Sequence, residues 1–233
     1  KSTLKEVLDS NWLGVYVNAD DIEADIRQRG FLALEDFGVE TSEAELHAFF
    51  EESILLRKSG LLEAALQIRL QDGRVVFGAV AVNSYFASVL VDFIRHDLVR
   101  RKVSFTFETV MSAHAKVEFF CLAREQGFRT YLYYVATEDP EINVSRVAHR
   151  VSMGKHDVPK EKIVERYHRS LDYLADAVMC SDRAYVFDNS TAERVWVAEI
   201  TDGADLEMKT DSMPYWFKTA LLDKLAADEP GQE

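Results

Sequence analysis

The chain has 233 residues, of which 48% are hydrophobic and 29% are charged, so it can bury a sizeable core. Its formal net charge of -13 argues against a general nucleic-acid binder or a protein that binds anionic membranes. The sequence has neither a run of about 18 apolar residues nor a signal-peptide pattern. We therefore expect a cytoplasmic protein, in which Cys121 and Cys180 are buried free thiols.

Predicted strands and helices alternate along the first half of the chain. In order, we expect a helix over 2–10, a strand over 12–18, a helix over 19–29, a loop over 31–38, a helix from 41 to about 58, a hairpin over 66–78, a helix over 84–101 and a strand over 103–107. Asp72-Gly73 is a typical hairpin turn, although a helix continuing over 61–70 is an alternative for the first arm. Thr41, Ser42 and Glu45 have the spacing of a helix start.

The second half continues the alternation. We expect a helix over 112–126, a strand over 130–136, helices over 140–153 and 159–178, a strand over 183–187, a hairpin over 194–209 and a helix over 214–226. Strands that alternate with helices predict a mainly parallel sheet with helices on both faces. In such sheets the chemistry lies at the carboxyl ends of the strands.

Polar side chains follow the predicted strands at these ends. Asp20 and Asp21 come after the first strand, where they are either first-turn helix carboxylates or a general base for a substrate hydroxyl. Glu108 ends an apolar strand, and a carboxylate there is costly unless it is paired or faces a cleft. Thr109 is either a helix cap or a substrate contact, and the segments 137–139 and 188–190 are polar as well.

Four arginines occupy the helices predicted over 140–178. Arg146 and Arg150 are spaced to share one helix face, and Arg166 and Arg169 share another. They form either a solvated basic face paired with glutamates or a clamp on a transferring phosphate.

Lys1-Ser2 matches the end of the phosphate-binding pattern G-x-x-x-x-G-K-[ST]. In that pattern the lysine reaches the phosphates and the hydroxyl ligates Mg²⁺. The glycines would precede residue 1, so an ordinary dipeptide is the alternative.

Several of these segments together resemble the zeta-toxin-like P-loop kinases, and more narrowly their stand-alone bacterial branch of predicted ATPases. The similarity covers roughly residues 1–190 and is carried by the segments 107–112, 127–135, 146–151, 156–159, 166–171 and 182–190. It implies an α/β P-loop NTPase fold, an adenylate-kinase-like three-layer parallel sheet with a helical lid and a small C-terminal hairpin. On this interpretation residues 1–233 form one domain, with a substrate-side insertion over 61–101, the lid over 140–170 and a C-terminal hairpin and helix over 191–233.

The resemblance also implies roles for individual residues. Those expected to be catalytic are Asp20 as the base, Glu108 as the carboxylate near the substrate or a metal-bound water, and Arg150 and Arg166 as lid arginines. Those expected to bind the nucleotide are Lys1, Ser2, Arg146, Arg169 and Asn189, with Ser2 also at the metal. Those expected to contact the substrate are Asn18, Thr109 and Asn83. The chain departs from the family in lacking the P-loop glycines and in having Lys155 where many relatives have glycine.

The implied activity is phosphoryl transfer from ATP or GTP, with Mg²⁺, to a hydroxyl of a small metabolite. Zeta toxins act on nucleotide sugars such as UDP-N-acetylglucosamine, which makes such a sugar the expected acceptor class. The alternatives are a nucleotide-binding regulatory protein with little turnover, such as a toxin component neutralised by an antitoxin-like partner, and an inactive fragment that keeps the fold. Neither nucleic acid nor a membrane is an expected partner.

Overall fold

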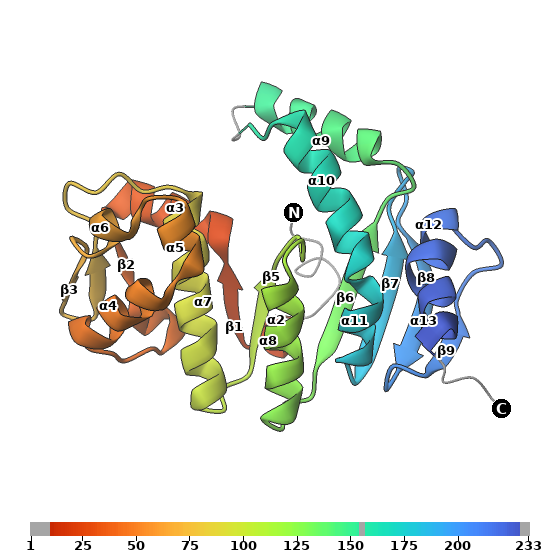
Figure 1. Cartoon of the computed structure of the whole chain (residues 1–233), viewed down its shortest axis with the longest axis horizontal. Helices are drawn as coiled ribbons and strands as arrows, with labels where there is room; N and C mark the ends of the chain where they lie inside the picture. Colours follow the sequence, from red (N-terminus) through yellow and green to blue (C-terminus); the bar gives the residue numbers. More distant parts are fainter. Residues whose placement is uncertain (1–9, 154–156, 229–233) are drawn as a thin grey trace. The chain divides into compact units, whose positions relative to one another are not determined.

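The computed structural model describes residues 10–153 and 157–228 (Figure 1). The chain divides into two compact units, Lys1–Thr109 and Val110–Glu233, each with its own hydrophobic core. No helix within the described ranges is long and apolar enough to cross a membrane.

The first unit combines helices with short strands. Its elements in chain order are α2 (Ser10–Leu13), β1 (Val15–Asn18), α3 (Ala19–Arg29), β2 (Phe31–Ala33), η1 (Leu34–Phe37), α4 (Glu43–Glu52), α5 (Ile54–Lys58), α6 (Leu62–Ala65), β3 (Arg69–Gln71), β4 (Arg74–Val76), α7 (Ser84–Arg100) and β5 (Phe105–Glu108).

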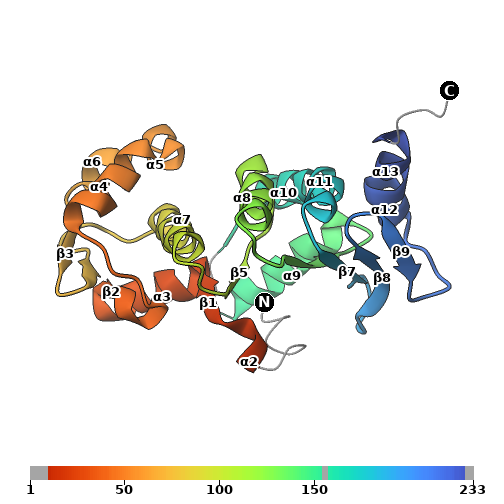
Figure 2. The ribbon, with the colours of Figure 1, turned by 90° about the horizontal axis from the view of Figure 1, so that it is seen from below.

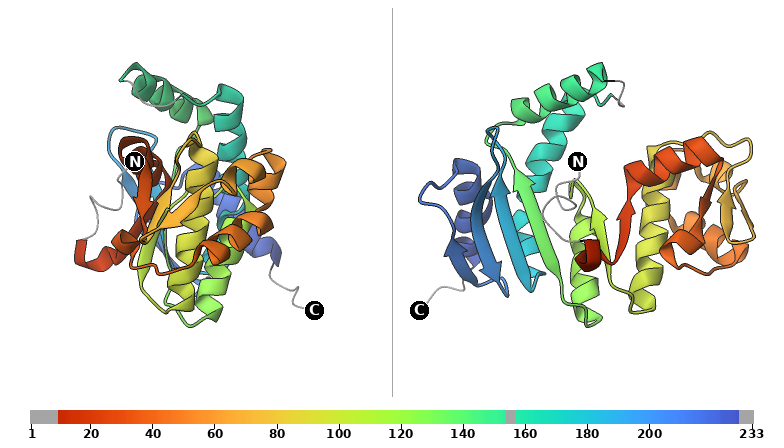
Figure 3. Two further views of the ribbon diagram at one scale, coloured as in Figure 1. Left: turned by 90° about the vertical axis from the view of Figure 1, so that its left-hand side faces the viewer. Right: turned by 180° about the vertical axis from the view of Figure 1, so that it is seen from behind.

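Strands β1 and β5 form a parallel pair in which Asn18 lies opposite Glu108. Because side chains alternate along a strand, Val17 and Phe107 face the core while Tyr16, Asn18 and Glu108 share the other face. Strand β1 leads directly into α3, as Figure 3 shows. The pair therefore places polar side chains at its carboxyl end, as the sequence predicts.

The expectation of a loop over 31–38 is wrong. Residues Phe31–Ala33 form β2, which pairs antiparallel with β4, and Leu34–Phe37 form a 3₁₀ turn. The predicted hairpin is confirmed as β3 and β4, and its turn residues Asp72 and Gly73 both have positive φ. Strand β2 depends on this hairpin for its hydrogen bonds, so local sequence carries little sign of it.

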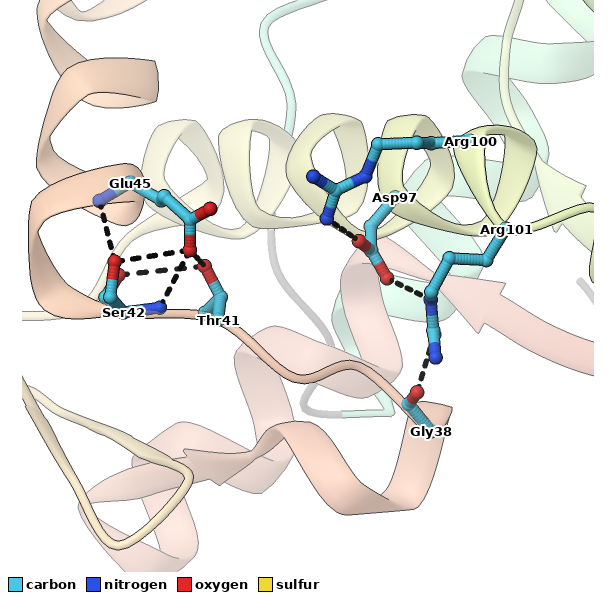
Figure 4. Close-up of polar contacts among 7 residues, drawn as sticks. All are labelled: Gly38, Thr41, Ser42, Glu45, Asp97, Arg100 and Arg101. Carbon is cyan, nitrogen blue, oxygen red and sulfur yellow. Dashed lines mark hydrogen bonds and ion pairs between the residues drawn. The ribbon is translucent and has the colours of Figure 1, made fainter.

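Helix α7 organises the core of the first unit. It buries Phe86, Leu90 and Ile94, among others, and packs against α3. Near its end the buried carboxylate of Asp97 contacts the guanidinium groups of Arg100 and Arg101. Figure 4 shows these contacts together with the bond from Arg101 to the Gly38 carbonyl. The cluster ties the C-terminal end of α7 to the loop before α4.

Figure 4 also shows the helix start that the sequence predicts at Ser42. The Ser42 hydroxyl accepts from the Glu45 amide, and the Glu45 carboxylate accepts from the Ser42 amide. The single helix expected from there to about 58 is wrong, because Ser53 adopts extended backbone angles and separates α4 from α5. The Ser53 hydroxyl then caps α5 by accepting from the Leu56 amide.

The second unit is a four-stranded mixed sheet with helices. Its elements are α8 (His114–Glu125), β6 (Tyr131–Ala136), α9 (Pro140–Ser152), α10 (Lys160–Asp172), α11 (Leu174–Met179), β7 (Arg183–Asp188), β8 (Val195–Thr201), β9 (Asp205–Met208), α12 (Tyr215–Phe217), the π-helical turn η2 (Lys218–Leu222) and α13 (Asp223–Asp228).

The strand order is β6-β7-β8-β9, with β6 and β7 parallel and the remaining pairs antiparallel. Figure 2 shows α8, α11 and α13 on the same side of this sheet. The predicted C-terminal hairpin is confirmed as β8 and β9. An α/β architecture with parallel strand pairs is thus present, whereas one continuous three-layer sheet remains a prediction.

Three other expected boundaries are corrected. The strand predicted over 12–18 begins only at Val15, because α2 extends to Leu13 and Gly14 turns the chain. The helix predicted over 159–178 is two helices, α10 and α11, with Tyr173 between them. The helix predicted over 214–226 contains the π-helical turn η2.

The expectation of free thiols is also wrong. Cys121 on α8 and Cys180 after α11 form a disulfide across 59 residues of sequence. The enclosed segment contains β6, α9, α10 and α11. The two cysteines are distant in sequence, so their pairing depends on the packing of α8 against α11.

Gly14 offers a test of the first unit. Its φ is +59°, and a Cβ there would lie 2.5 Å from the Ser104 carbonyl oxygen. Gly14→Ala combines backbone strain with a clash against backbone, so we expect a loss of about 3 kcal/mol in the free energy of unfolding. Gly60→Ala is the control, because Gly60 also has positive φ but open space around it, and we expect about 1 kcal/mol there. Equal losses in urea denaturation would contradict the close approach.

The disulfide gives a second test. Closing a loop of about 60 residues lowers the entropy of the unfolded chain and contributes about 4 kcal/mol in the chain-entropy model. We expect reductant to lower the free energy of unfolding of the chain by up to that amount. A Cys121→Ser, Cys180→Ser double variant should show the lower stability with and without reductant. If reductant leaves the stability of the unaltered chain unchanged, the two thiols are not bonded in solution.

Candidate functional site

The candidate site in the first unit lies at the carboxyl end of β1 and β5. Asn18 is 7% exposed, and its side-chain nitrogen donates to the Glu108 carboxylate over 2.9 Å. Its side-chain oxygen accepts from the backbone amides of Asp20 at 2.9 Å and Asp21 at 3.3 Å. One buried amide therefore connects the Glu108 carboxylate to the first turn of α3.

Tyr16 is a member of this cluster that we did not single out from the sequence. The side-chain nitrogen of Asn18 lies 3.4 Å from its hydroxyl. The pKa of Tyr16 is raised to about 12, mainly by burial; the hydrogen bond with Asn18 acts to lower it, and the Glu108 carboxylate acts to raise it. The alternation of β1 could have indicated Tyr16, because it lies two residues before Asn18 on the same face.

Asp20 and Asp21 occupy the first turn of α3, and both side chains are exposed. Carboxylates are favourable there because the helix dipole is positive at its N-terminal end. Thr109 follows β5 directly and is exposed too. The site thus has two carboxylates at the ends of paired strands. Glu108 ends β5 and is partly buried, whereas Asp20 follows β1 and is accessible. An accessible carboxylate of this kind can accept a proton from a bound hydroxyl.

Asn83 has a structural role besides the substrate contact expected from the sequence. Its side-chain oxygen accepts from the amides of Tyr85 at 3.0 Å and Phe86 at 3.2 Å, so it caps α7. Its predicted contact with a substrate remains a prediction.

The second unit has a separate polar cluster at the carboxyl end of β7. The Asp188 carboxylate, 9% exposed, accepts from the indole nitrogen of Trp216 over 2.7 Å and from the Ser190 hydroxyl over 2.9 Å. The Ser190 hydroxyl in turn accepts from the Glu138 amide over 2.8 Å. The cluster holds the loops after β6 and β7 together. Asn189 lies between Asp188 and Ser190, which both belong to the cluster.

The base of the helical pair α9–α10 is tied to the same loops. The Tyr167 hydroxyl donates to the Thr137 carbonyl over 2.8 Å, and the Asn143 amide donates to the Thr137 hydroxyl over 2.8 Å. Arg146 donates to the backbone carbonyl of Asn189 over 2.7 Å. The guanidinium of Arg146 thus forms a hydrogen bond to Asn189 within the protein. Both residues were expected to bind the nucleotide.

The other three arginines differ in their surroundings. Arg169 forms an ion pair with Glu165 over 3.0 Å, and both side chains are largely exposed. Arg150 is half-buried on α9, and Arg166 is exposed on α10. Helices α9 and α10 contact each other, so these arginines belong to one helical pair, as predicted.

Two parts of the predicted site lie outside the described residues. These are Lys1 and Ser2, expected to bind phosphate and metal, and the lid turn at 154–156 with Lys155. Within the described ranges, no group of three or more histidine, cysteine, aspartate or glutamate side chains is arranged to hold a metal ion. Mg²⁺ commonly takes only one or two carboxylates beside water and phosphate oxygens, so Asp20 and Glu108 remain compatible with it.

Comparison with known proteins finds one partial similarity. An uncharacterized protein of Haemophilus influenzae is 28% identical over 72 residues, which cover 31% of this chain and 51% of that protein. The matched region thus spans about half the length of the relative. No family model matches the chain, and no solved structure matches it.

The buried bond between Trp216 and Asp188 is open to test. Trp216→Phe leaves an aromatic ring but removes the indole donor, so a buried carboxylate oxygen loses a partner. We expect the free energy of unfolding to fall by about 2 kcal/mol. Trp196→Phe is the matched control, because Trp196 is 40% exposed, and we expect about 1 kcal/mol or less. Equal losses for both variants in denaturant titrations would argue against the Asp188 contact.

Proposed function

We propose that this chain is part of a zeta-toxin-like P-loop kinase that transfers the γ-phosphoryl group of ATP or GTP to a hydroxyl of a small metabolite. The observation that carries the proposal is the cluster of Asn18, Asp20 and Glu108 at the carboxyl end of the parallel pair β1–β5. Carboxyl ends of parallel strands are where α/β enzymes bind ligands.

The proton chemistry falls to Asp20 in this proposal. Its side chain is exposed in the first turn of α3, so it can accept a hydrogen bond from an incoming hydroxyl. Glu108, held by Asn18, contacts the substrate or a metal-bound water. Such kinases depend mostly on positioning and on electrostatic stabilisation of the transferred group, so rigidly held carboxylates suit the task.

The parallel strand pairs support a P-loop fold. In the first unit β1 pairs parallel with β5, and in the second unit β6 pairs parallel with β7. A P-loop strand needs parallel neighbours of this kind.

The helical pair α9–α10 supports a lid. It carries Arg150 and Arg166 and is hydrogen bonded at its base to the loops after β6 and β7. Guanidinium groups are suited to the charge that develops on a phosphoryl group in transfer. Lys1, Ser2, Arg169 and Asn189 are the further residues that we assign to the nucleotide, with Ser2 as a Mg²⁺ ligand. The nucleotide supplies the phosphoryl group and Mg²⁺ neutralises its charge.

We assign the acceptor to the nucleotide-sugar class, with UDP-N-acetylglucosamine as the first candidate, because of the resemblance to zeta toxins. We also propose that the protein works in the cytoplasm, where ATP and nucleotide sugars are available, although disulfides such as Cys121–Cys180 are uncommon in that compartment. On the basis of the same resemblance, we propose an antitoxin-like protein as a binding partner.

The test uses this chain together with any residues that precede Lys1 in its gene. We expect transfer of label from γ-labelled ATP to a nucleotide sugar in the presence of Mg²⁺. Asp20→Asn removes the base and should lower kcat by about 100- to 10,000-fold. Arg166→Ala should lower it by about 1,000-fold or more, because a charge-stabilising arginine is lost.

Two controls match these variants. Asp25→Asn also removes a carboxylate from α3, and that carboxylate pairs with Arg29. Arg183→Ala removes an exposed arginine that pairs with Glu199. Both should leave kcat within about twofold of the unaltered protein, since neither residue belongs to the site. Unchanged transfer by Asp20→Asn and Arg166→Ala would refute the assignment.

A further inference from the structure

We infer that Asn18 is a positioning residue, which holds the Glu108 carboxylate and the first turn of α3 in fixed register, rather than a contact for the substrate. The inference rests on the proposed function for its catalytic consequence. The part that concerns geometry, that Asn18 holds Glu108 and the first turn of α3, depends only on contacts within the first unit.

The hydrogen-bonding capacity of the Asn18 side chain is taken up within the protein. A primary amide offers two N–H donors and one carbonyl oxygen with two lone pairs. The oxygen accepts from the amides of Asp20 and Asp21. The nitrogen donates to Glu108 over 2.9 Å and lies 3.4 Å from the Tyr16 hydroxyl. All four positions have a partner, so none remains for a substrate.

The orientation of the amide follows from its neighbours. Its oxygen faces two backbone N–H groups, which can only donate, and its nitrogen faces a carboxylate. A flipped amide would place its oxygen against the Glu108 carboxylate and its NH₂ group against the two amides. Both contacts would then be repulsive, and at 7% exposure little water could relieve them.

The position of Asn18 in the chain connects two elements. It is the last residue of β1, directly opposite Glu108 on β5, and also the N-cap of α3. A shift of its side chain would therefore move the Glu108 carboxylate relative to Asp20. An error of about 1 Å in such a pair can cost about 100-fold in rate.

Substitutions can separate the two halves of the side chain. Asn18→Ser keeps a cap oxygen for α3 but lacks the NH₂ group that donates to Glu108, and its shorter side chain holds its one hydroxyl at the cap. Asn18→Asp also keeps the cap but places a second carboxylate against Glu108. Asn83→Ser measures the structural cost of the same exchange, because Asn83 caps α7 through two amides in the same way.

The first readout is spectroscopic and needs no activity. In ¹⁵N-labelled protein, we expect Glu108→Gln to shift the side-chain NH₂ signals of Asn18, because their charged acceptor becomes neutral. Asp25→Asn, on the helix α3 that Asn18 caps, should leave those signals in place. If Glu108→Gln does not shift them, the contact between Asn18 and Glu108 is absent and the inference fails.

The second readout is kinetic. We expect Asn18→Ser to lower kcat by about 10- to 100-fold with KM for the acceptor nearly unchanged, as for other residues that orient a reacting group. Asn18→Asp should lower kcat at least as much. Asn18→Ser should be less stable than Asn83→Ser, because Glu108 also loses its donor. A rise in KM with kcat preserved would make Asn18 a substrate contact and overturn the inference.

The two readouts distinguish the inference from the proposed function. If the unaltered protein transfers no phosphoryl group, the proposed function fails, and the NMR signals still decide whether Asn18 holds Glu108. If transfer occurs and Asn18→Ser is as active as the unaltered protein, the proposed function stands and the positioning role is overturned.

Discussion

The parallel pairing of β1 with β5 is the constraint on which the candidate site depends. It sets Asn18 opposite Glu108, and the alternation of both strands places their side chains on the face away from the core. The other face, with Val17 and Phe107, packs into the apolar cluster around α7. Burial of the apolar face therefore fixes the register of the two strands, because a one-residue slip would exchange the buried apolar side chains with the polar ones.

The second unit shows a related arrangement. Strands β6 and β7 are parallel, and the loops that follow them are joined through Asp188, Ser190 and Glu138. The helical pair α9–α10 is bonded to those loops by Tyr167 and Arg146, so the arginines that it carries start from a defined base. The disulfide between Cys121 and Cys180 closes the segment that contains this pair. Both units thus use strand ends to position polar groups.

Local patterns predicted many elements and the strand-end residues well. The periodicity of 84–101, the Ser42–Glu45 spacing and the Asp72-Gly73 turn each depend on neighbours in sequence, and each is confirmed. Features that depend on distant residues were missed. Strand β2 needs β4, Asp188 needs Trp216 28 residues away, and the two cysteines meet across 59 residues. The capping roles of Asn18 and Asn83 were missed for a different reason. A helix cap and a substrate contact use the same type of side chain, so the residue type does not distinguish them.

We propose that the carboxyl end of β1–β5 receives the phosphate acceptor. The most direct test is an NMR titration of ¹⁵N-labelled protein with UDP-N-acetylglucosamine, together with Mg²⁺ and a non-hydrolysable ATP analogue. We expect saturable shifts in the backbone amide signals of Asp20, Asp21, Glu108 and Thr109. Saturable binding that leaves these four signals unchanged and shifts others would show that the acceptor binds elsewhere.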